Sequence, residues 1–374
     1  MPANAKKSVE LSGVVVAQSS ISSIDPGEGV LMYRGYSIED LAEHSTYEEV
    51  CWLLLHGELP GPGPFAGFET QLAQSRDLPA DAAAAVAAAT GVSSMEMLRT
   101  VVSVLGYSDE DKDSNAHEAD LAKATRLIAR IPTAIACHDR RRRGLDPVAP
   151  NPELGIAANL LAMLRGEEPP EEEARAIDVA FIIHAEHEMN ASTFTARCVA
   201  GTGADLHSAI VAAICALKGP LHGGANEAVM AMLEEFGSPA EVEAGVQGRL
   251  ERKEKLFGVG HPLYRATDPR APILRRLAGA LAPEGQERKW IEMAERLEEV
   301  ANAEKGLWPN VDLYAGSLYR YLGIPKDLYT PLFAAARTVG WAAHVDEQHR
   351  DNKIIRPSAE YVGHERRPFP VPAR

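Results

Sequence analysis

The sequence predicts an all-α fold with a small N-terminal β-hairpin, and three observations support this prediction. Amphipathic runs and helix-capping signals recur along nearly the whole chain after residue 36, whereas strand-like runs stay within residues 13–36. Aromatic residues make up only 6% of the chain, so Ala, Leu and Val must fill the interior, a mixture that favours helices. Strands and helices do not alternate, and no repeat of solenoid length is present.

Composition and charge exclude several classes of protein. At about 150 residues per domain, a chain of 374 residues suggests two or three domains. The formal net charge of −15 argues against a nucleic acid or an anionic membrane as the main partner. The four cysteines form no CxxC pair, which argues against a disulfide framework or a zinc site. No signal-peptide pattern and no membrane-spanning run is present, so we expect a cytoplasmic protein.

The hairpin and the first helices follow from short-range signals. In residues 13–36, the β-branched runs GVVVAQSSISSI and VLMYRGY flank a DPGEG turn. Ser37 and Asp40 then have capping-box spacing, which indicates the start of a helix. Ser45 and Glu48 repeat that spacing and predict a second helix, YEEVCWLLLHG, which ends at its last glycine.

Later segments continue the helical pattern. GPGPFAG is predicted to be a loop, ADAAAAVAAAT a packing helix, and the acidic stretch from Ser108 a solvated loop. PEEEARA predicts the acidic first turn of another helix. Apolar residues from Val229 to Phe236 recur at i, i+3, i+4 and i+7, and Gly237 ends that helix. Similar amphipathic runs cover residues 243–255, 271–282 and 288–304.

The first candidate for chemistry is His222, in KGPLHGGANEAVM. Gly219 and Pro220 break the preceding apolar helix, and the next helix begins near Ala225 or Asn226. A histidine at a helix N-terminus feels the positive end of the dipole, which keeps the imidazole neutral, as an electrophilic hydrogen-bond donor requires. The alternative is an ordinary loop histidine, which the flanking glycines disfavour.

A second candidate is the segment LFGVGHPLYRATDPR. Gly258 and Gly260 allow the backbone to approach a ligand closely, and His261 follows at once. Arg265 and Arg270 lie within ten residues of it and have the chemistry to clamp carboxylates by bidentate pairing. A surface loop with solvated arginines fits the spacing equally well.

Asp312 and Arg337 are candidates whose role depends on burial. In WPNVDLYAG, Asp312 is most simply an N-cap, since Asp is preferred at helix starts. To act as a base on carbon, it needs a dry pocket. Arg337 lies in an Ala- and Gly-rich helix that should pack closely, so we expect a buried guanidinium with an anionic partner, either a protein carboxylate or a substrate.

A zinc site at the histidine pair is not supported. His184 and His187 are three residues apart, which predicts one helix face, and the following NAST indicates a break or cap. The HExxH motif needs a histidine at position 191, where the chain has Ala191, and HxxEH is not matched either. A lone histidine here is usually a satisfied core residue.

Together, these motifs resemble one protein family. The chain contains, in the order found in citrate synthases, LYRGYSIEDLAEHSTYEEV, HAEHEMNASTFTAR, LKGPLHGGANEAVM, GVGHPLYRATDPR, WPNVDLYAG, FAAARTVGWAAHVDEQ and IIRPSAEYVG. The match runs from Leu31 to Gly363 and is similar to the short bacterial and archaeal branch that includes 2-methylcitrate synthases. Spacing and composition alone do not identify this family.

The resemblance implies a homodimer of almost entirely α-helical subunits, each with two domains. The large domain would comprise residues 1–218 and 324–374, and the small domain, residues 219–323, would close over the substrates. Because the chain begins close to the YRGY motif, we expect no extra N-terminal domain of the hexameric, NADH-inhibited type.

The resemblance also implies roles for the candidate residues. Asp312 would remove a proton from the methyl group of acetyl-CoA, while neutral His222 hydrogen-bonds the thioester oxygen. His261 would bind and protonate the keto oxygen of oxaloacetate. The implied ligands of oxaloacetate are His187, Arg270, Arg337 and, reaching across from the other subunit, Arg356.

For coenzyme A, the resemblance implies contacts along one segment and near its phosphates. The segment consists of Leu256, Phe257, Gly258, Val259 and Gly260. Arg265 and Lys305 would lie near the phosphates. The run Arg140 to Arg143 falls near a family arginine that meets the phosphates from the other subunit, although a solvated basic turn explains most of that run. Neither a metal nor a resident cofactor is implied, because the CoA thioester is a substrate.

Two departures from the family pattern bear on the substrates, the first on CoA contacts and the second on acyl specificity. Pro262 replaces an arginine common in bacterial members, and residues 92–95 replace a common His-Pro-Met. The expected activity is condensation of acetyl-CoA with oxaloacetate to citrate, at the entry to the tricarboxylic acid cycle. The alternative is a 2-methylcitrate synthase that uses propionyl-CoA, or both substrates, because one methylene changes binding by only about 1–3 kcal/mol. A catalytically dead scaffold on the same fold is a third reading, which the retained candidate residues disfavour.

Overall fold

A computed structural model describes residues 14–261 and 263–369 of the chain. Helices dominate these residues, as predicted. The strands are β1 (Ser22–Asp25), β2 (Val30–Tyr33) and β3 (Tyr36–Ser37). The α-helices are α1 (Ile38–His44), α2 (Tyr47–His56), α3 (Pro62–Gln74), α4 (Ala80–Ala88), α5 (Ser94–Leu105), α6 (His117–Arg142), α7 (Ile156–Arg165), α8 (Glu171–His184), α9 (Ala191–Ala200), α10 (Leu206–Leu217), α11 (Ala225–Phe236), α12 (Val242–Glu251), α13 (Arg270–Leu281), α14 (Lys289–Lys305), α15 (Val311–Tyr321) and α16 (Tyr329–Arg350).

The N-terminal hairpin is confirmed, but it is shorter than predicted and gains a third strand. β1 pairs antiparallel with β2, from Ser22 opposite Tyr33 to Asp25 opposite Val30, and β3 extends the sheet. Residues 14–21 form no strand because β2 has only four residues, which β1 already pairs. Position 13 lies outside the described residues.

The first helices correct two local predictions. The Ser37 side chain accepts the N–H of Asp40 at 3.0 Å, as expected. The capping box of α2 lies one residue later than predicted, at Thr46 and Glu49. Glu48 is not available for a cap, because it turns into the core and accepts the N–H of Ile156. Left-handed Gly57 ends α2, as predicted.

GPGPFAG is not a loop but begins α3. Pro62 occupies the first turn, where its missing N–H costs nothing, and Phe68 and Leu72 bury one face of the helix. The acidic stretch from Ser108 is a loop, as predicted, although it is not wholly solvated. Asp109 is buried and accepts two hydrogen bonds from Arg126, at 2.7 and 2.9 Å.

The remaining predicted helices are confirmed as α4, α8, α11, α12, α13 and α14, with small shifts at their ends. The four cysteines are free. No helix in the described residues is long and apolar enough to cross a membrane.

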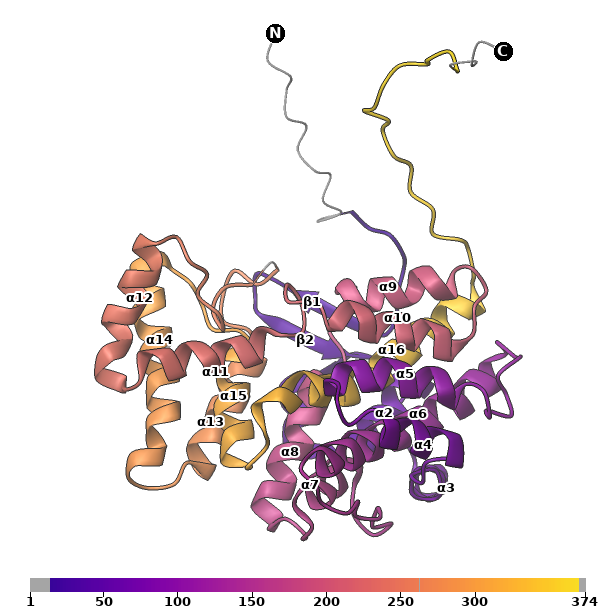
Figure 1. Cartoon of the computed structure of the whole chain (residues 1–374), viewed down its shortest axis with the longest axis horizontal. Helices are drawn as coiled ribbons and strands as arrows, with labels where there is room; N and C mark the ends of the chain where they lie inside the picture. Colours follow the sequence, from indigo (N-terminus) through magenta and orange to yellow (C-terminus); the bar gives the residue numbers. More distant parts are fainter. Residues whose placement is uncertain (1–13, 262, 370–374) are drawn as a thin grey trace, which may run out of the picture.

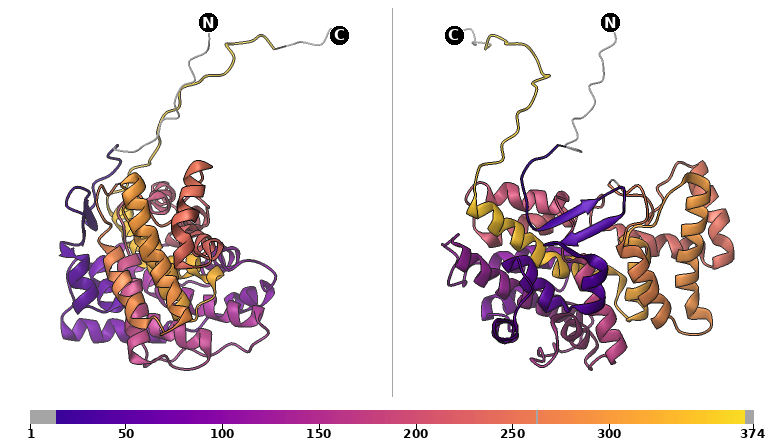
Figure 2. Two further views of the ribbon diagram at one scale, coloured as in Figure 1. Left: turned by 90° about the vertical axis from the view of Figure 1, so that its left-hand side faces the viewer. Right: turned by 180° about the vertical axis from the view of Figure 1, so that it is seen from behind.

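The helices form two groups with the sheet between them. Figure 1 shows α11–α15 at one end of the molecule and α2–α10 at the other, with β1 and β2 near the junction. Helix α16 is buried along nearly its whole length and packs against both groups, through α6, α9 and α10 on one side and α11 on the other. Its Ala- and Gly-rich sequence permits this close packing. After Asn352, which donates to the Gly201 carbonyl at 3.3 Å, the described C-terminal residues to 369 run away from the helices in extended form (Figure 2). The domain boundaries remain a prediction.

Candidate active site

A cleft of about 760 Å³ lies where the two groups of helices meet. The cleft is lined by residues 14–17, 187–191, 194, 221, 222, 225, 255–261, 263, 270, 310–312, 333 and 337. It therefore brings together six of the predicted site residues, which are distant in sequence: His187, His222, His261, Arg270, Asp312 and Arg337.

His222 is held by a tight turn between α10 and α11. The turn closes through the Gly223 N–H, which donates to the Leu217 carbonyl at 3.0 Å. A Cβ at Gly223 would lie 2.3 Å from the Leu217 oxygen, so only glycine fits there. Helix α11 begins at Ala225, as predicted, with Gly224 as its N-cap.

The hydrogen bonds of His222 define its tautomer. Its Nε2 accepts the backbone N–H of Ser192 at 3.3 Å and lies 2.8 Å from the Ser192 hydroxyl. A backbone N–H only donates, so Nε2 carries no proton and the ring hydrogen sits on Nδ1. Burial, with Arg337 as a second cause, lowers the pKa of His222 to about 4. The imidazole is therefore a neutral hydrogen-bond donor, as predicted. The main cause of its neutrality is burial and not the predicted effect of the helix dipole.

His261 and Asp312 are brought together by two adjacent backbone segments. Val259 forms an isolated antiparallel bridge with Pro309, and the Gly260 N–H donates to the Trp308 carbonyl at 2.7 Å. Gly258 has a φ of 81°, and a Cβ there would lie 3.0 Å from the backbone of Leu313. The sequence predicted that this segment approaches a ligand closely. In the structure its backbone closely approaches the start of α15.

His261 is also a neutral imidazole. Its Nδ1 accepts the backbone N–H groups of Leu263 and Tyr264, at 3.1 and 3.2 Å. The ring hydrogen must therefore sit on Nε2. Burial, followed by the positive charge of Arg270, lowers the pKa of His261 to about 4.

Asp312 is not the N-cap of α15, contrary to the simplest prediction. Asn310 is the cap, and its side chain accepts the Asp312 N–H at 3.0 Å. The Asp312 carboxylate is thereby freed to line the cleft. Burial raises its pKa to about 6, although Arg270, Lys255 and Arg337 act in the opposite direction. A carboxylate in this environment is a stronger base than one in water.

Arg337 is buried, as predicted, and no described carboxylate forms an ion pair with it, although the buried Glu186 acts on its charge from farther away. The side chain is 1% exposed, its Nε donates to the His184 carbonyl at 2.6 Å, and its guanidinium lies 4.6 Å from the centre of the Phe333 ring. Its Nη2 is buried without a partner, and no carboxylate among the described residues lies within 4.0 Å. Burial lowers the pKa of Arg337 to about 10. Such a charge calls for an anionic ligand in the cleft.

Arg270 supplies a second positive charge to the cleft. It is 3% exposed, and Asp268 orients it by accepting bonds from Nε at 2.9 Å and from Nη2 at 2.7 Å. His187, His261 and Asp268 offer possible metal-ligand atoms within 4.8 Å of one another. Asp268 is already committed to Arg270, and the two guanidinium groups disfavour a cation. The cleft therefore suits a dianionic ligand better than a metal ion.

His187 and His184 do not share a helix face, contrary to prediction. Helix α8 ends at His184, whose Nδ1 lies 2.7 Å from the Ala180 carbonyl in the core. His187 lies beyond the helix end and faces the cleft, which a pair on one helix would not allow. Asn190 caps α9 by accepting the N–H groups of Ser192 and Thr193, as the NAST motif predicts.

The predicted CoA residues divide into two sets. Residues 256–260 line the cleft. Arg265 and Lys305 are exposed and do not line it, and Arg356 lies on the extended C-terminal segment, away from it. Residues 92–95 do not line it either, since Ser94 instead bonds His138 at 3.1 Å. Pro262 lies outside the described residues.

The run Arg140 to Arg143 is largely structural rather than a solvated basic turn. Arg140 donates to the Asp146 carbonyl, and Arg142 forms an ion pair with Asp327 at 2.6 Å. These contacts tie the end of α6 to neighbouring segments. A CoA contact for this run remains a prediction.

Sequence reasoning missed three residues that the structure places at the site. Lys255 lines the cleft next to the predicted CoA segment. Trp341 donates its indole N–H to the Ser192 hydroxyl at 3.1 Å, and Ser192 in turn holds His222. The adjacent Lys255 could have been found from its position, but Ser192 and Trp341 are 149 residues apart and no local pattern connects them.

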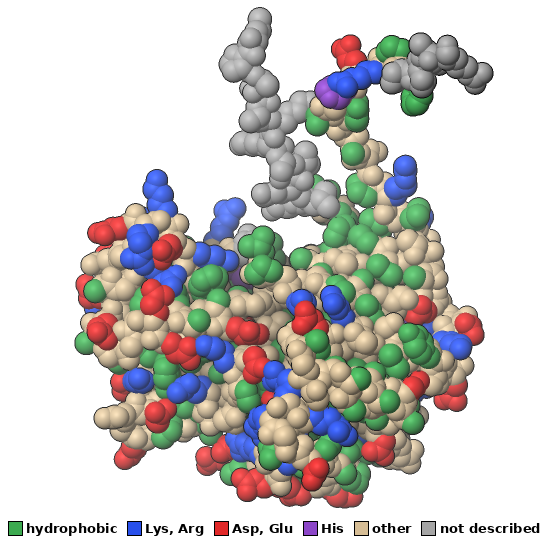
Figure 3. Space-filling model, in the orientation of Figure 1, with side chains coloured by type: hydrophobic (Ala, Val, Ile, Leu, Met, Phe, Trp, Pro, Cys, Tyr) green, Lys and Arg blue, Asp and Glu red, His purple; other side chains and the backbone are tan. Residues whose placement is uncertain are grey.

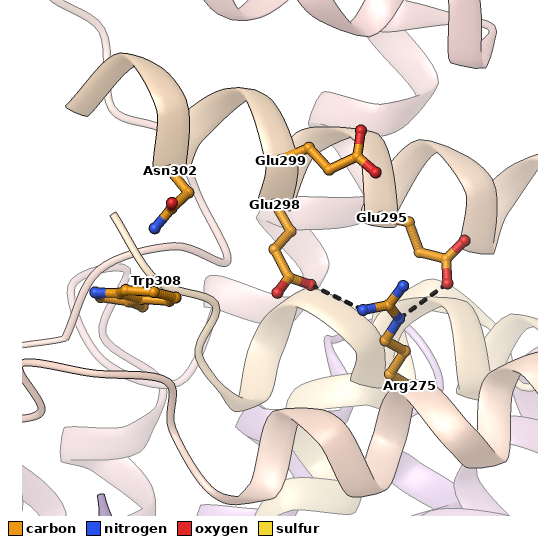
Figure 4. A pocket seen from close by; sticks show the side chains of 6 residues that line it. All are labelled: Arg275, Glu295, Glu298, Glu299, Asn302 and Trp308. Atoms are coloured by element: carbon orange, nitrogen blue, oxygen red, sulfur yellow. Dashed lines mark hydrogen bonds and ion pairs between the residues drawn. The ribbon is translucent and has the colours of Figure 1, made fainter. Parts of the chain in front are cut away.

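A second cavity, of about 300 Å³, lies between α13 and α14 (Figure 4). It is lined by Arg275, Glu295, Glu298, Glu299, Asn302 and Trp308. Arg275 is paired with Glu295 at 2.9 Å and lies 3.8 Å from Glu298. None of the predicted site residues reaches this cavity, so it is not the candidate site.

Comparisons with known proteins agree with this geometry. A family model described as citrate synthase, C-terminal domain, matches residues 10–358. Citrate synthase 2 of Bacillus subtilis is 45% identical over 361 residues, with 96% of each chain covered. A 2-methylcitrate synthase of Mycobacterium tuberculosis is 40% identical, covering 96% of this chain and 91% of its own. A citrate synthase from Thermoplasma acidophilum, solved with carboxymethyl coenzyme A and oxaloacetate, superimposes with a TM-score of 0.91 at 32% identity and 96% coverage of each chain.

Proposed function

The chain belongs to the citrate synthase family, and we propose that it condenses acetyl-CoA with oxaloacetate and water to give citrate and CoA. One observation carries the proposal on the structural side: the buried Arg337 guanidinium faces the cleft, and its Nη2 has no hydrogen-bond partner among the described residues. A carboxylate of a ligand such as oxaloacetate would bind this Nη2, and a second carboxylate would meet Nη1 of Arg270, whose Nε and Nη2 are held by Asp268.

In the first step, Asp312 removes a proton from the methyl group of acetyl-CoA. The carboxylate suits this role because burial raises its pKa to about 6, so it is basic yet ionised at neutral pH. His222 donates its Nδ1 hydrogen to the thioester oxygen as the enol forms. Because the imidazole is neutral, it stabilises this oxygen through a hydrogen bond and not through a full positive charge.

In the second step, the enol attacks the keto carbon of oxaloacetate. His261 donates from Nε2 to the keto oxygen and protonates it as the carbon–carbon bond forms. Arg270 and Arg337 bind the carboxylates, and His187 lies beside His261, with ring centres 5.3 Å apart, to contact oxaloacetate. Water then hydrolyses the citryl-CoA thioester, which releases CoA and makes the condensation irreversible.

Coenzyme A lies along residues 256–260 in this proposal, with Lys255 as an added contact. The citrate synthase from Thermoplasma acidophilum was solved with carboxymethyl coenzyme A, which supports a CoA site in this fold. Arg265, Lys305 and the run Arg140 to Arg143 remain proposed contacts of the CoA phosphates. The thioester is a substrate, and we propose neither a resident cofactor nor a metal.

We propose further that two chains form a homodimer with shared active sites. Helices α9 and α10 turn an almost uncharged face outward, made of residues 191, 194, 195, 198, 199, 208, 211, 212, 215 and 216. The surface over these helices is mostly apolar or neutral (Figure 3). Ala191 and Phe194 belong both to this face and to the cleft lining, so a partner seated there reaches the site. Arg356, exposed on the C-terminal segment, is the proposed contribution of each chain to the other.

We also propose that the reaction serves the entry of acetyl groups into the tricarboxylic acid cycle, in the cytoplasm. Relatives from bacteria and archaea, such as Bacillus subtilis and Haloferax volcanii, support this proposal.

The test of the proposed function is a comparison of two acyl-CoAs. Purified chain is assayed with oxaloacetate and either acetyl-CoA or propionyl-CoA, with release of the CoA thiol as the readout. A higher kcat/KM for acetyl-CoA is expected. A clear preference for propionyl-CoA would assign the chain to the 2-methylcitrate synthases, and no release with either would leave only a scaffold.

A further inference from the structure

We propose that Tyr264 is a positioning residue for oxaloacetate, because it holds both His187 and His261 at once. The inference rests on the proposed function and adds a residue to it. Tyr264 lies three residues after His261, in the segment between α12 and α13, whereas His187 follows α8. Tyr264 therefore connects two parts of the chain that each supply one imidazole to the cleft.

The contact with His187 is made by the phenol. The Tyr264 hydroxyl lies 3.2 Å from Nε2 of His187, and the two ring centres are 5.7 Å apart in an edge-to-face arrangement. Tyr264 is 5% exposed and His187 is 7% exposed, so water does not replace this bond easily. A buried hydroxyl left without a partner is costly, which makes the bond an anchor for the imidazole.

The contact with His261 is made by the ring and the backbone of Tyr264. Its N–H donates to Nδ1 of His261 at 3.2 Å, and the two ring centres are 4.6 Å apart. This bond leaves the His261 hydrogen on Nε2, the atom that donates to the keto oxygen. Tyr264 thus shares with Leu263 in setting the tautomer of His261, and its hydroxyl also holds His187.

The consequence concerns oxaloacetate more than acetyl-CoA. The Tyr264 hydroxyl makes the one side-chain hydrogen bond of His187 among the residues described. Without the phenol, only packing against neighbours such as His261 holds the ring in the position that meets oxaloacetate. Binding then includes the cost of ordering it. Asp312 and His222, the residues proposed to act on acetyl-CoA, make no hydrogen bond to Tyr264.

The test is Tyr264→Phe, which removes only the hydroxyl and keeps both the ring and the backbone N–H. Calorimetry with oxaloacetate alone is expected to show a Kd raised about tenfold, equivalent to about 1.4 kcal/mol. The KM for acetyl-CoA is expected to change less than twofold. An unchanged Kd for oxaloacetate, or an equal rise in both constants, would overturn the proposal.

Tyr329→Phe is the matched control. The Tyr329 hydroxyl is also buried and donates to the Gly316 carbonyl at 3.1 Å, but Tyr329 does not line the cleft. This variant is expected to lower the melting temperature and leave the Kd for oxaloacetate unchanged. If it raised the Kd as much as Tyr264→Phe, the effect would be general loosening and the proposal would be wrong.

A double-mutant cycle asks whether Tyr264 acts through His187. On a His187→Ala background, Tyr264→Phe is expected to add less than twofold to the Kd, because the phenol has no imidazole to hold. A full tenfold effect there contradicts the proposal.

A measurement on the unsubstituted chain avoids any folding defect. With 15N-labelled histidine, the resonance lost in His187→Ala is expected to report a hydrogen-bonded Nε2, and a free Nε2 overturns the proposal. This measurement also separates failure of the proposed function from failure of the Tyr264 proposal. If only the proposed function is wrong, the unsubstituted chain does not turn over acetyl-CoA, but the His187 resonance still reports a hydrogen-bonded Nε2.

Discussion

At the scale of single residues, burial decides what the candidate groups do. Burial lowers the pKa values of His222 and His261 to about 4 and raises that of Asp312 to about 6. All three shifts oppose the charged form, because each group is removed from water. At neutral pH the cleft therefore holds two neutral imidazoles and an ionised carboxylate of raised basicity, the combination that proton removal from carbon needs.

Asp312→Asn is expected to abolish condensation while leaving oxaloacetate binding largely intact. The amide is nearly isosteric but cannot accept the proton, and loss of a general base typically costs about 10²–10⁴-fold in rate. The measurement pairs kcat with the Kd for oxaloacetate from calorimetry. Loss of oxaloacetate binding in this variant shows instead that Asp312 has a structural role.

The pH dependence of the reaction follows from the same carboxylate. Only ionised Asp312 accepts a proton, so kcat/KM for acetyl-CoA is expected to fall about tenfold per pH unit below pH 6. His222 and His261 are neutral down to about pH 4, so their titration does not contribute to the loss of activity between pH 6 and pH 4. Circular dichroism at each pH checks that the chain stays folded. A flat profile between pH 7.5 and pH 5 contradicts the assignment.

The raised pKa of Asp312 also predicts a cost in stability. The folded state holds the proton more tightly than the unfolded chain, so stability from this group is present below its unfolded pKa and is lost as pH rises through about 6. Asp312→Asn is therefore expected to raise the free energy of unfolding at pH 7.5 by about 1–3 kcal/mol. Urea denaturation at pH 7.5 and at pH 4 measures this, and the gain is expected to be smaller at pH 4. Destabilisation at pH 7.5 refutes it.

At the scale of elements, helix ends and tight turns aim the functional side chains. Asn310 caps α15 and thereby places Asp312 in the first turn, facing the cleft. The turn at Gly223 directs His222 into the cleft just before α11 begins. The bridge between Val259 and Pro309 holds the segment that carries His261 beside the start of α15. His222 and Asp312 thus lie at helix starts, where backbone hydrogen bonds or a cap orient them, whereas Arg337 lies within α16.

Gly223→Ala tests the turn that holds His222. The added Cβ would meet the Leu217 carbonyl oxygen at 2.3 Å, so the turn must open, at a cost of about 2 kcal/mol. We expect a lower melting temperature and a larger loss in kcat than in oxaloacetate affinity. Gly224→Ala is the matched control, because its nearest neighbour is 3.9 Å away. If both variants behaved alike, the geometry of the turn would not matter.

At the scale of the whole molecule, the cleft lies between two groups of helices and beside an uncharged outer face. Helix α16 is buried along nearly its whole length, contacts both groups and carries Arg337 into the cleft, while Arg270 reaches it from the start of α13. The face made by α9 and α10 adjoins the cleft through Ala191 and Phe194. Catalysis and assembly are thereby expected to depend on each other.

Ala212→Arg places a charge in the middle of that face. Burying an unpaired guanidinium in an interface is costly, so this variant is expected to be monomeric in sedimentation and to lose at least about tenfold in kcat. Ala84→Arg, on the exposed side of α4, is the matched control and is expected to change neither property. A dimeric, fully active Ala212→Arg chain contradicts the proposed interface.

The sequence by itself determined the helical class, several helix ends, the hairpin turn and the family, because these depend on residue type and on neighbours within a few positions. The acidic first turn of α8, the glycine that ends α2 and the amphipathic run of α11 are of this kind.

Only the tertiary structure decided which groups are neutral, which are charged and which hold one another. Asp312 is freed from capping by a neighbouring asparagine, Ser192 and Trp341 fix His222, and Tyr264 joins His187 to His261. The physical reason is that desolvation and hydrogen bonding depend on atoms brought together from distant parts of the chain, and no local pattern records which atoms those are.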